Sequence, residues 1–307
     1  TGSDIFVMKF NSNASLEWTH TYGGSEDDRG FDIVELSTGG FALIGYSKSE
    51  DGDASLNQGQ HDNWVLRIDA MGTLLWEKSF GFLGHDHAYN IIATEDGGLF
   101  FNGFLDVTAS KGAGQDGKQF HYNQRHGVGE FWCHKIDQNG NLVWRRYFGG
   151  TSNDRSYDAI ETTEGDFVLV GASESQDLDI SDPRGSYDAW IVKLNAGGDL
   201  IWERSFGGSE YDGAQSILEN RNGDYVVMGQ TYSKDEDIKN AKGSSDIFLA
   251  FYSKEGDLKF TTNIGNEGFE TASALFERAD GTLVLLGHQA PLGMSSQESF
   301  LTNNLFL

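Results

Sequence analysis

An internal repeat runs through the 307 residues of this chain and constrains the fold more than any other feature of the sequence. An aromatic residue heads each copy, at Trp18, Trp76, Trp144, Trp202 and Phe260. An acidic series keeps the same register, at Asp28, Asp86, Asp154, Asp212 and Glu270. Successive aromatic positions are 58, 68, 58 and 58 residues apart. The repeat is therefore regular except for ten extra residues in one copy.

Each copy contains four short apolar segments, which turns rich in glycine, aspartate and asparagine separate. In the first full copy these segments are Gly30–Leu36, Phe41–Tyr46, Asn63–Ile68 and Leu74–Phe80. Each has the length of a strand, and no stretch shows the 3.6-residue period of an amphipathic helix. Four strands in a repeat of this length are typical of a β-propeller blade. The sequence therefore predicts an all-β fold, a β-propeller.

The two ends of the chain indicate the number of blades. Asp4–Phe10 and Leu16–Tyr22 have third- and fourth-strand sequences, whereas Thr271–Glu277 and Thr282–His288 have first- and second-strand sequences. We expect a single domain over residues 1–307 with five four-stranded blades. The repeat units cover residues 28–85, 86–153, 154–211 and 212–269, and residues 1–27 close the ring against residues 270–307. The tail Ser299–Leu307 either completes the last blade or lies outside it, and six blades are the alternative if the natural chain is longer.

The repeated glycines and tryptophans have structural interpretations. One glycine precedes the second strand of each copy, where a turn requires a positive φ: Gly39, Gly97, Gly165, Gly223 and Gly281. Another lies at a strand end, where backbones approach closely: Gly45, Gly103, Gly171, Gly229 and Gly287. The aromatic series lies on the fourth strand, and we expect it to pack between neighbouring blades.

Composition excludes several classes of protein. The formal net charge is −25, from 22 Lys and Arg against 47 Asp and Glu, which argues against a nucleic-acid partner. No apolar run approaches the roughly 20 residues of a membrane-spanning helix. A single cysteine, Cys133, rules out an internal disulfide framework. The chain starts without a signal-peptide pattern, which is compatible with a processed or trimmed protein.

Two copies carry a motif of Asp-x-Trp, an apolar run, Gly-x-Leu-x-Trp and Phe-Gly. They are residues 62–81, DNWVLRIDAMGTLLWEKSFG, and residues 188–209, DAWIVKLNAGGDLIWERSFGGS. This pattern resembles the Trp/Gly-Gly-Ser repeat β-propeller proteins, which are surface or secreted proteins of Gram-negative bacteria. The resemblance covers nearly the whole chain and implies a lipoprotein or a sorted secreted protein at the outer-membrane surface. It implies no agreed activity, because such propellers mainly serve as binding or scaffold modules.

Acidic residues gather in two kinds of loop. Connections in an antiparallel blade alternate between its two edges, so the leading loop, Gly23–Asp28, and the long loop, Ser47–Asp62, share one face. Aspartates around a glycine can supply the oxygen ligands that Ca²⁺ prefers, and calcium is a candidate cofactor. The candidate ligands are Asp51, Asp53, Asp62, Asp177, Asp179, Asp188, Asp235, Asp237 and Asp246. Alternatively, these aspartates form Asx-turns and hydrate the surface. The acids of the leading loops are expected to bond backbone amides.

The copy from Gly81 to Trp144 departs most from the repeat and holds five of the eight histidines. Its two loops carry the candidate ligand-binding residues His85, His87, His121, Tyr122, Arg125 and His126. Three interpretations compete: a site for a polar ligand such as a glycan, a transition-metal site in which His121 or His126 completes His85-x-His87, and a surface insertion that tolerated drift. On the predicted strand beyond, Cys133 is interpreted as a structural thiol and His134 as a packed or edge histidine.

No nucleophile elbow, phosphate loop or dinucleotide fingerprint is present, so we predict no enzyme and no catalytic residue. Asp32 and Asp158 are equivalent first-strand positions that could face a central channel as in a propeller glycosidase, but polar lining is the favoured interpretation. We expect an extracellular or cell-surface propeller that binds a protein partner or a glycan at its acidic long-loop face. A propeller glycosidase and a structural spacer in a surface assembly are the alternatives.

Overall fold

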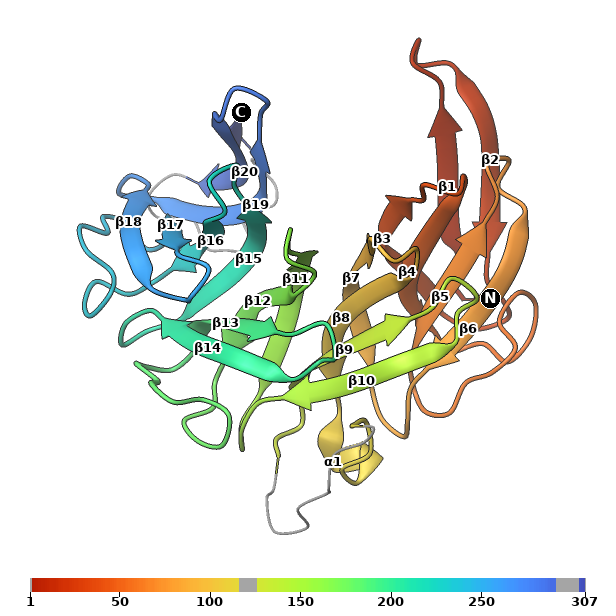
Figure 1. Ribbon diagram of the computed structural model, residues 1–307, viewed down its shortest axis with the longest axis horizontal. Helices are drawn as coiled ribbons and strands as arrows, with labels where there is room; N and C mark the ends of the chain where they lie inside the picture. Colours follow the sequence, from red (N-terminus) through yellow and green to blue (C-terminus); the bar gives the residue numbers. More distant parts are fainter. Residues whose placement is uncertain (1, 116–125, 291–303, 307) are drawn as a thin grey trace. The chain divides into compact units, whose positions relative to one another are not determined.

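The computed structural model describes residues 2–115, 126–290 and 304–306, and its regular secondary structure is almost entirely β-strand (Figure 1). Within these ranges the exception is one short helix, α1 (Val107–Ser110). No helix of the described ranges is long and apolar enough to cross a membrane. The chain divides into two compact parts, Thr1–Phe148 and Gly149–Leu307.

Three antiparallel sheets form the N-terminal part, and in each of them strands adjacent in sequence pair with one another. The first sheet contains β1 (Ile5–Phe10) and β2 (Leu16–Tyr22). The second contains β3 (Asp28–Glu35), β4 (Phe41–Ser47), β5 (Asp62–Ile68) and β6 (Leu74–Phe80). The third contains β7 (His87–Ala93), β8 (Leu99–Leu105), β9 (Glu130–Ile136) and β10 (Leu142–Phe148).

The C-terminal part repeats this arrangement with three further sheets. The first contains β11 (Asp154–Glu161), β12 (Phe167–Ser173), β13 (Asp188–Leu194) and β14 (Leu200–Phe206). The second contains β15 (Asp212–Glu219), β16 (Tyr225–Thr231), β17 (Asp246–Tyr252) and β18 (Leu258–Ile264). The third contains β19 (Phe269–Glu277), β20 (Leu283–Ala290) and β21 (Asn304–Phe306).

Each of the four full repeats forms one four-stranded antiparallel sheet, which confirms the predicted strand content of a repeat. Among the described residues there are also one three-stranded and one two-stranded sheet. The third strand of the last sheet comes from the tail, because β21 pairs with β20. Five blades, and closure of the ring by residues 1–27 against residues 270–307, stay predictions.

The register of the strands confirms that the leading loop and the long loop flank one edge of the sheet. Asp28, at the start of β3, is opposite Ser47, at the end of β4, and Ser47 is opposite Asp62, at the start of β5. The other full repeats have the same register; in the fourth one, Asp212 is opposite Thr231 and Thr231 is opposite Asp246. We call this edge the loop edge of a repeat.

The core lies on the middle strands of the four-stranded sheets. Every residue of β8, β9, β12 and β13 is buried, as expected for apolar strands that are covered on both faces. The glycine predictions are confirmed. The series that starts at Gly39 has φ between 79° and 89°. A Cβ at Gly45 or Gly103 would overlap the carbonyl oxygen of the neighbouring first strand.

The fourth-strand tryptophans pack against the next repeat, as predicted. Trp18 Nε1 donates to the carbonyl of Ala70 at 3.0 Å, and Trp202 Nε1 donates to that of Lys254 at 3.1 Å. Both acceptors belong to the turn after the third strand of the following repeat. Phe260, which has no indole N–H for such a bond, is 57% exposed.

Candidate functional site

Buried acids hold the leading loops in place. Asp28, Asp86, Asp154 and Asp212 have no exposed surface, and Oδ2 of each accepts a hydrogen bond from the backbone amide four residues earlier, at 2.7–2.9 Å. Hydroxyl groups add to this; Ser47 and Ser49 donate to Asp28 at 2.5 and 2.8 Å. The expectation that these acids bond turn amides is confirmed.

The candidate calcium ligands also accept backbone hydrogen bonds. Asp51 accepts from the amide of Ser25 at 2.7 Å, and Asp53 from that of Gly23 at 3.2 Å, so they join the long loop to the leading loop. The same bonds recur at Asp177, Asp179, Asp235 and Asp237. At the third-strand positions Asp62, Asp188 and Asp246, Oδ2 accepts from the amide four residues earlier.

In two of these carboxylates, one of the two oxygens lacks a hydrogen-bond partner among the described residues. These oxygens are Oδ1 of Asp62 and Oδ1 of Asp188, and both are buried. Burial raises the pKa of Asp62 to about 6. A cation would compensate such an oxygen. Calcium binding at these loops stays a prediction.

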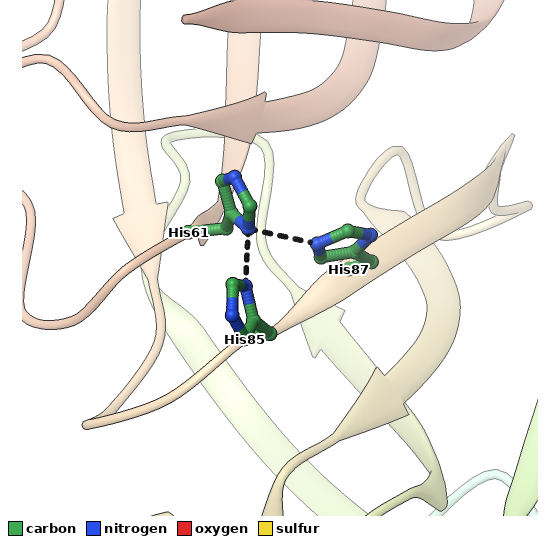
Figure 2. Close-up of side chains that lie close together, drawn as sticks. All are labelled: His61, His85 and His87. Atoms are coloured by element: carbon green, nitrogen blue, oxygen red, sulfur yellow. Dashed lines mark hydrogen bonds between the residues drawn. The ribbon is translucent and has the colours of Figure 1, made fainter. Parts of the chain in front are cut away.

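Three histidines converge at the loop edge between the first and second repeats. In Figure 2, one ring nitrogen of His61 faces a ring nitrogen of His85 and a ring nitrogen of His87. His61 Nδ1 is 2.6 Å from His85 Nδ1 and 3.1 Å from His87 Nε2. Among the His, Cys, Asp and Glu side chains in the described ranges, these form the one group of three whose ligand atoms all lie within 4.8 Å of one another. We call His61, His85 and His87 the histidine cluster.

Backbone pairing brings the cluster together. His61 and His85 form a parallel bridge, in which Gln60 N donates to Gly84 O at 2.9 Å and Asp86 N donates to His61 O at 2.9 Å. Side chains alternate between the two sides of an extended chain, so the Asp86 side chain points away from the side that His85 and His87 share. The Asp86 carboxylate is buried and accepts from the amides of Phe82 and Asp106.

The surroundings keep the central histidine uncharged. His61 is 8% exposed, and burial is the main cause that lowers its pKa to about 4. The positive charges of Lys48 and Arg29 act in the same direction, whereas the negative charge of Asp27 opposes them. At neutral pH, His61 therefore has a lone pair on one ring nitrogen.

Aromatic rings form one side of the cluster. The ring centroid of Tyr46 is 4.3 Å from that of His61 and 4.7 Å from that of His87, and the Phe104 ring is 5.0 Å from His87. The hydroxyl of Tyr46 donates to Asp27 at 3.2 Å, and Asp27 pairs with Arg29 at 3.1 Å. The rings therefore restrict the imidazoles, and a neutralised ion pair lies beside them.

Of the three candidate ligand-binding residues that lie in the described ranges, the structure brings together His85 and His87. The third, His126, instead has its Nδ1 3.2 Å from Oε2 of Glu130, and its ring packs edge-on against Tyr147. His121, Tyr122 and Arg125 lie outside the described residues.

The sequence analysis missed His61, the buried member of the cluster. A signal was present, because His61 and His85 are 24 residues apart and occupy repeat positions that Tyr187 and Tyr211 occupy in the third repeat. Tyr187 and Tyr211 form the same parallel bridge, with ring centroids 5.5 Å apart. Comparison of the repeats identifies the two histidines as one pair of equivalent positions, and the structure shows that these positions are neighbours.

Two residues beyond the long loop of the second repeat are structural. His134 has no exposed surface and stacks on Phe101 with ring centroids 4.4 Å apart, so it is a packed histidine, one of the two predicted possibilities. Cys133 is buried, and its Sγ lies 3.6 Å from the carbonyl oxygen of Arg146. The interpretation as a structural thiol is confirmed.

The first-strand carboxylates of the glycosidase alternative join neighbouring repeats. Asp32 Oδ2 accepts from the amide of Ile91 at 2.9 Å, and Asp158 Oδ2 accepts from the amide of Ile217 at 2.9 Å. Burial raises the pKa of Asp32. Both carboxylates therefore have a structural role in their own part of the chain.

Comparison of the sequence with known proteins gives a distant match. No family model matches the sequence. Regulatory protein FlaEY of Caulobacter vibrioides is 22% identical over 200 residues, which cover 62% of this chain and 20% of that protein. The chain thus spans about a fifth of the length of this curated relative.

A solved structure supports the architecture at low sequence identity. The Pan2 WD40 domain of Neurospora crassa is similar to this chain with a TM-score of 0.54 and 11% identity, over 94% of this chain and 69% of that one. An apocarotenoid oxygenase of Synechocystis is 15% identical to this chain over 92% of this chain and 61% of that one. Its TM-score of 0.45 is too low to support a common fold. WD40 domains are β-propellers. The chain therefore has a fold of the β-propeller type.

Proposed function

We propose that this chain is a non-catalytic propeller, secreted or at the cell surface, that binds a protein partner or a glycan at the loop edge of its repeats. The observation that carries the proposal is a row of aromatic rings at this edge in the C-terminal part. The row consists of Tyr187, Tyr211, Tyr232 and Phe269. Successive ring centroids are 5.5, 5.8 and 5.8 Å apart.

The row combines the chemistry of a recognition surface. All four rings are half-buried, so each is held by its neighbours and leaves part of its surface to solvent. The Tyr187 hydroxyl donates to Glu174 at 3.1 Å, which places a carboxylate beside the rings. Tyrosines combine a rigid apolar face with a polar tip, which suits both protein interfaces and sugar rings.

The experiment is a glycan array, together with affinity capture from the cell surface, with the full chain and two variants. Tyr211→Ala removes a central ring of the row, and we expect at least a tenfold loss of binding, as for a typical hot-spot residue. Phe260→Ala is the control, because Phe260 is an exposed ring on β18 outside the row. Equal binding by both variants would contradict the proposal.

The alternatives give different results in the same assay. A structural spacer would show no ligand on the array and no captured partner. A propeller glycosidase would hydrolyse a bound glycan, and Asp158→Ala would abolish that hydrolysis.

A further inference from the structure

We propose that His61, His85 and His87 form a binding site for a divalent transition-metal ion of the zinc and copper class. Imidazole nitrogen is a preferred ligand of these ions, and carboxylate-preferring ions such as Ca²⁺ and Mg²⁺ are not expected here. The inference does not depend on the proposed partner binding, because it concerns the N-terminal part alone.

The nitrogen positions are close to those of a bound ion. Zn²⁺ binds histidine nitrogen at about 2.0–2.1 Å, so two nitrogens of a tetrahedral site are about 3.3 Å apart. The distance from His61 Nδ1 to His87 Nε2 is 3.1 Å, and that to His85 Nδ1 is 2.6 Å. A ring rotation that moves His85 Nδ1 away from His61 Nδ1 by a fraction of an ångström would therefore make room for the ion. Three protein ligands leave a fourth position for water.

The backbone holds the ligands in place before an ion arrives. His61 and His85 are joined by the parallel bridge, and His87 starts β7, where it is opposite Phe104. Two hydrogen bonds to the buried Asp86 carboxylate fix the chain between His85 and His87. A preorganised site loses less conformational entropy on binding than a flexible one.

The hydrogen-bond geometry of the metal-free cluster also suits a metal. A histidine binds a metal ion through a ring nitrogen that carries no proton. If His61 Nδ1 accepts, His85 and His87 each direct an N–H group at this one nitrogen. When the metal ion binds, each of these two imidazoles carries its proton on its other ring nitrogen and binds the ion through the nitrogen that faces His61. Beside the cluster, Asp27 and Arg29 neutralise each other as an ion pair.

The repeat itself shows that folding does not require these imidazoles. Tyr187 and Tyr211 occupy the positions of His61 and His85 in the third repeat, and Ser245 and Phe269 occupy them in the fourth, with the same bridge. The histidines therefore have a role that the scaffold does not explain, and metal binding accounts for all three together.

The test is a titration of the chelator-treated full chain with Zn²⁺ and, separately, with Cu²⁺. We expect one ion per chain and a higher melting temperature, since a ligand that binds only the native state stabilises it. The Cu²⁺ complex should show electron paramagnetic resonance coupling to nitrogen. The variant His61→Tyr/His85→Tyr copies the third repeat, so it should keep the fold and lose at least a hundredfold in affinity.

Three controls make the outcome decisive. His288→Ala, on β20 of the C-terminal part, should bind like the parent chain. His87→Ala should weaken binding without a change in the circular dichroism spectrum of the metal-free chain. The proposal is overturned if the parent chain binds neither ion, or if the double tyrosine variant binds with the affinity of the parent.

Discussion

A buried indole–carboxylate pair in the third repeat allows the strength of one interaction to be predicted. Trp190 is fully buried, and its Nε1 donates to Glu203 Oε2 at 2.7 Å. Glu203 is 7% exposed and also accepts from the hydroxyl of Ser181. Trp64 and Glu77 form the same bond at 2.8 Å in the first repeat.

The fourth repeat provides a natural replacement for this pair. Phe248 stands at the position of Trp190, and Thr261 at that of Glu203. Glu203→Thr leaves the buried indole N–H without its acceptor, and Trp190→Phe leaves a buried carboxylate with one donor fewer. A hydrogen bond to a charged group contributes about 1.5–3 kcal/mol. The double variant should therefore be less destabilised than the sum of the single variants by about 1.5–3 kcal/mol.

The assay is urea unfolding followed by far-ultraviolet circular dichroism, which does not depend on the replaced tryptophan. Glu203→Thr combined with Trp64→Phe is the matched control, because these residues belong to different sheets and should give additive effects. If the Trp190→Phe/Glu203→Thr cycle is additive to within about 0.5 kcal/mol, the reasoning about the buried pair is refuted.

Three further predictions concern the glycine contacts, the loop acids and the candidate calcium ligands. Gly229→Ala would place a Cβ against the carbonyl of Gly213 and the Phe248 ring, so it should lower the free energy of unfolding by about 3 kcal/mol. Gly197→Ala, in an exposed turn, is the control and should change the free energy of unfolding by less than about 0.5 kcal/mol. Equal effects of the two variants would contradict the close-approach argument. Burial raises the pKa of Asp212 to about 6 from 3.8, so the folded chain holds this proton more tightly than the unfolded chain and stability from this group falls as the pH rises from about 4 to about 6. Asp212→Asn lacks this loss, and its stability relative to the parent should therefore increase by about 2–3 kcal/mol between pH 4 and pH 7 in urea titrations; an unchanged difference would show that burial does not act in this way. If calcium binds at Asp62, Asp188 and their equivalents, a calcium chelator should lower the melting temperature, and an unchanged temperature would remove calcium from the account.

The strands and turns of this fold were predictable from the sequence because they depend on short-range patterns. The positive φ at Gly39 and its equivalents, the pairing of four strands in each repeat, and the common edge of the two loops follow from residue spacing and antiparallel alternation. The roles of the leading-loop acids were also predictable, since a carboxylate four residues after a turn amide can reach it.

The partners of the polar side chains were less predictable. The Asp51 carboxylate accepts from an amide 26 residues earlier, and that of Asp32 from one 59 residues later. In a single sequence, such residues look like ligands for a cation or like catalytic acids. Their hydrogen bonds exist only after neighbouring strands and repeats have paired.

The sequence by itself determined that the chain folds into repeated four-stranded sheets and that loop acids and histidines share an edge. Only the tertiary structure decided that His61, rather than His126, completes the group around His85 and His87. The physical reason is that periodicity specifies which edge a side chain occupies, whereas its neighbours depend on a backbone bridge between two repeats and on burial. The parallel bridge between His61 and His85 places the imidazole at the end of the long loop of the first repeat beside the two imidazoles that precede and begin β7.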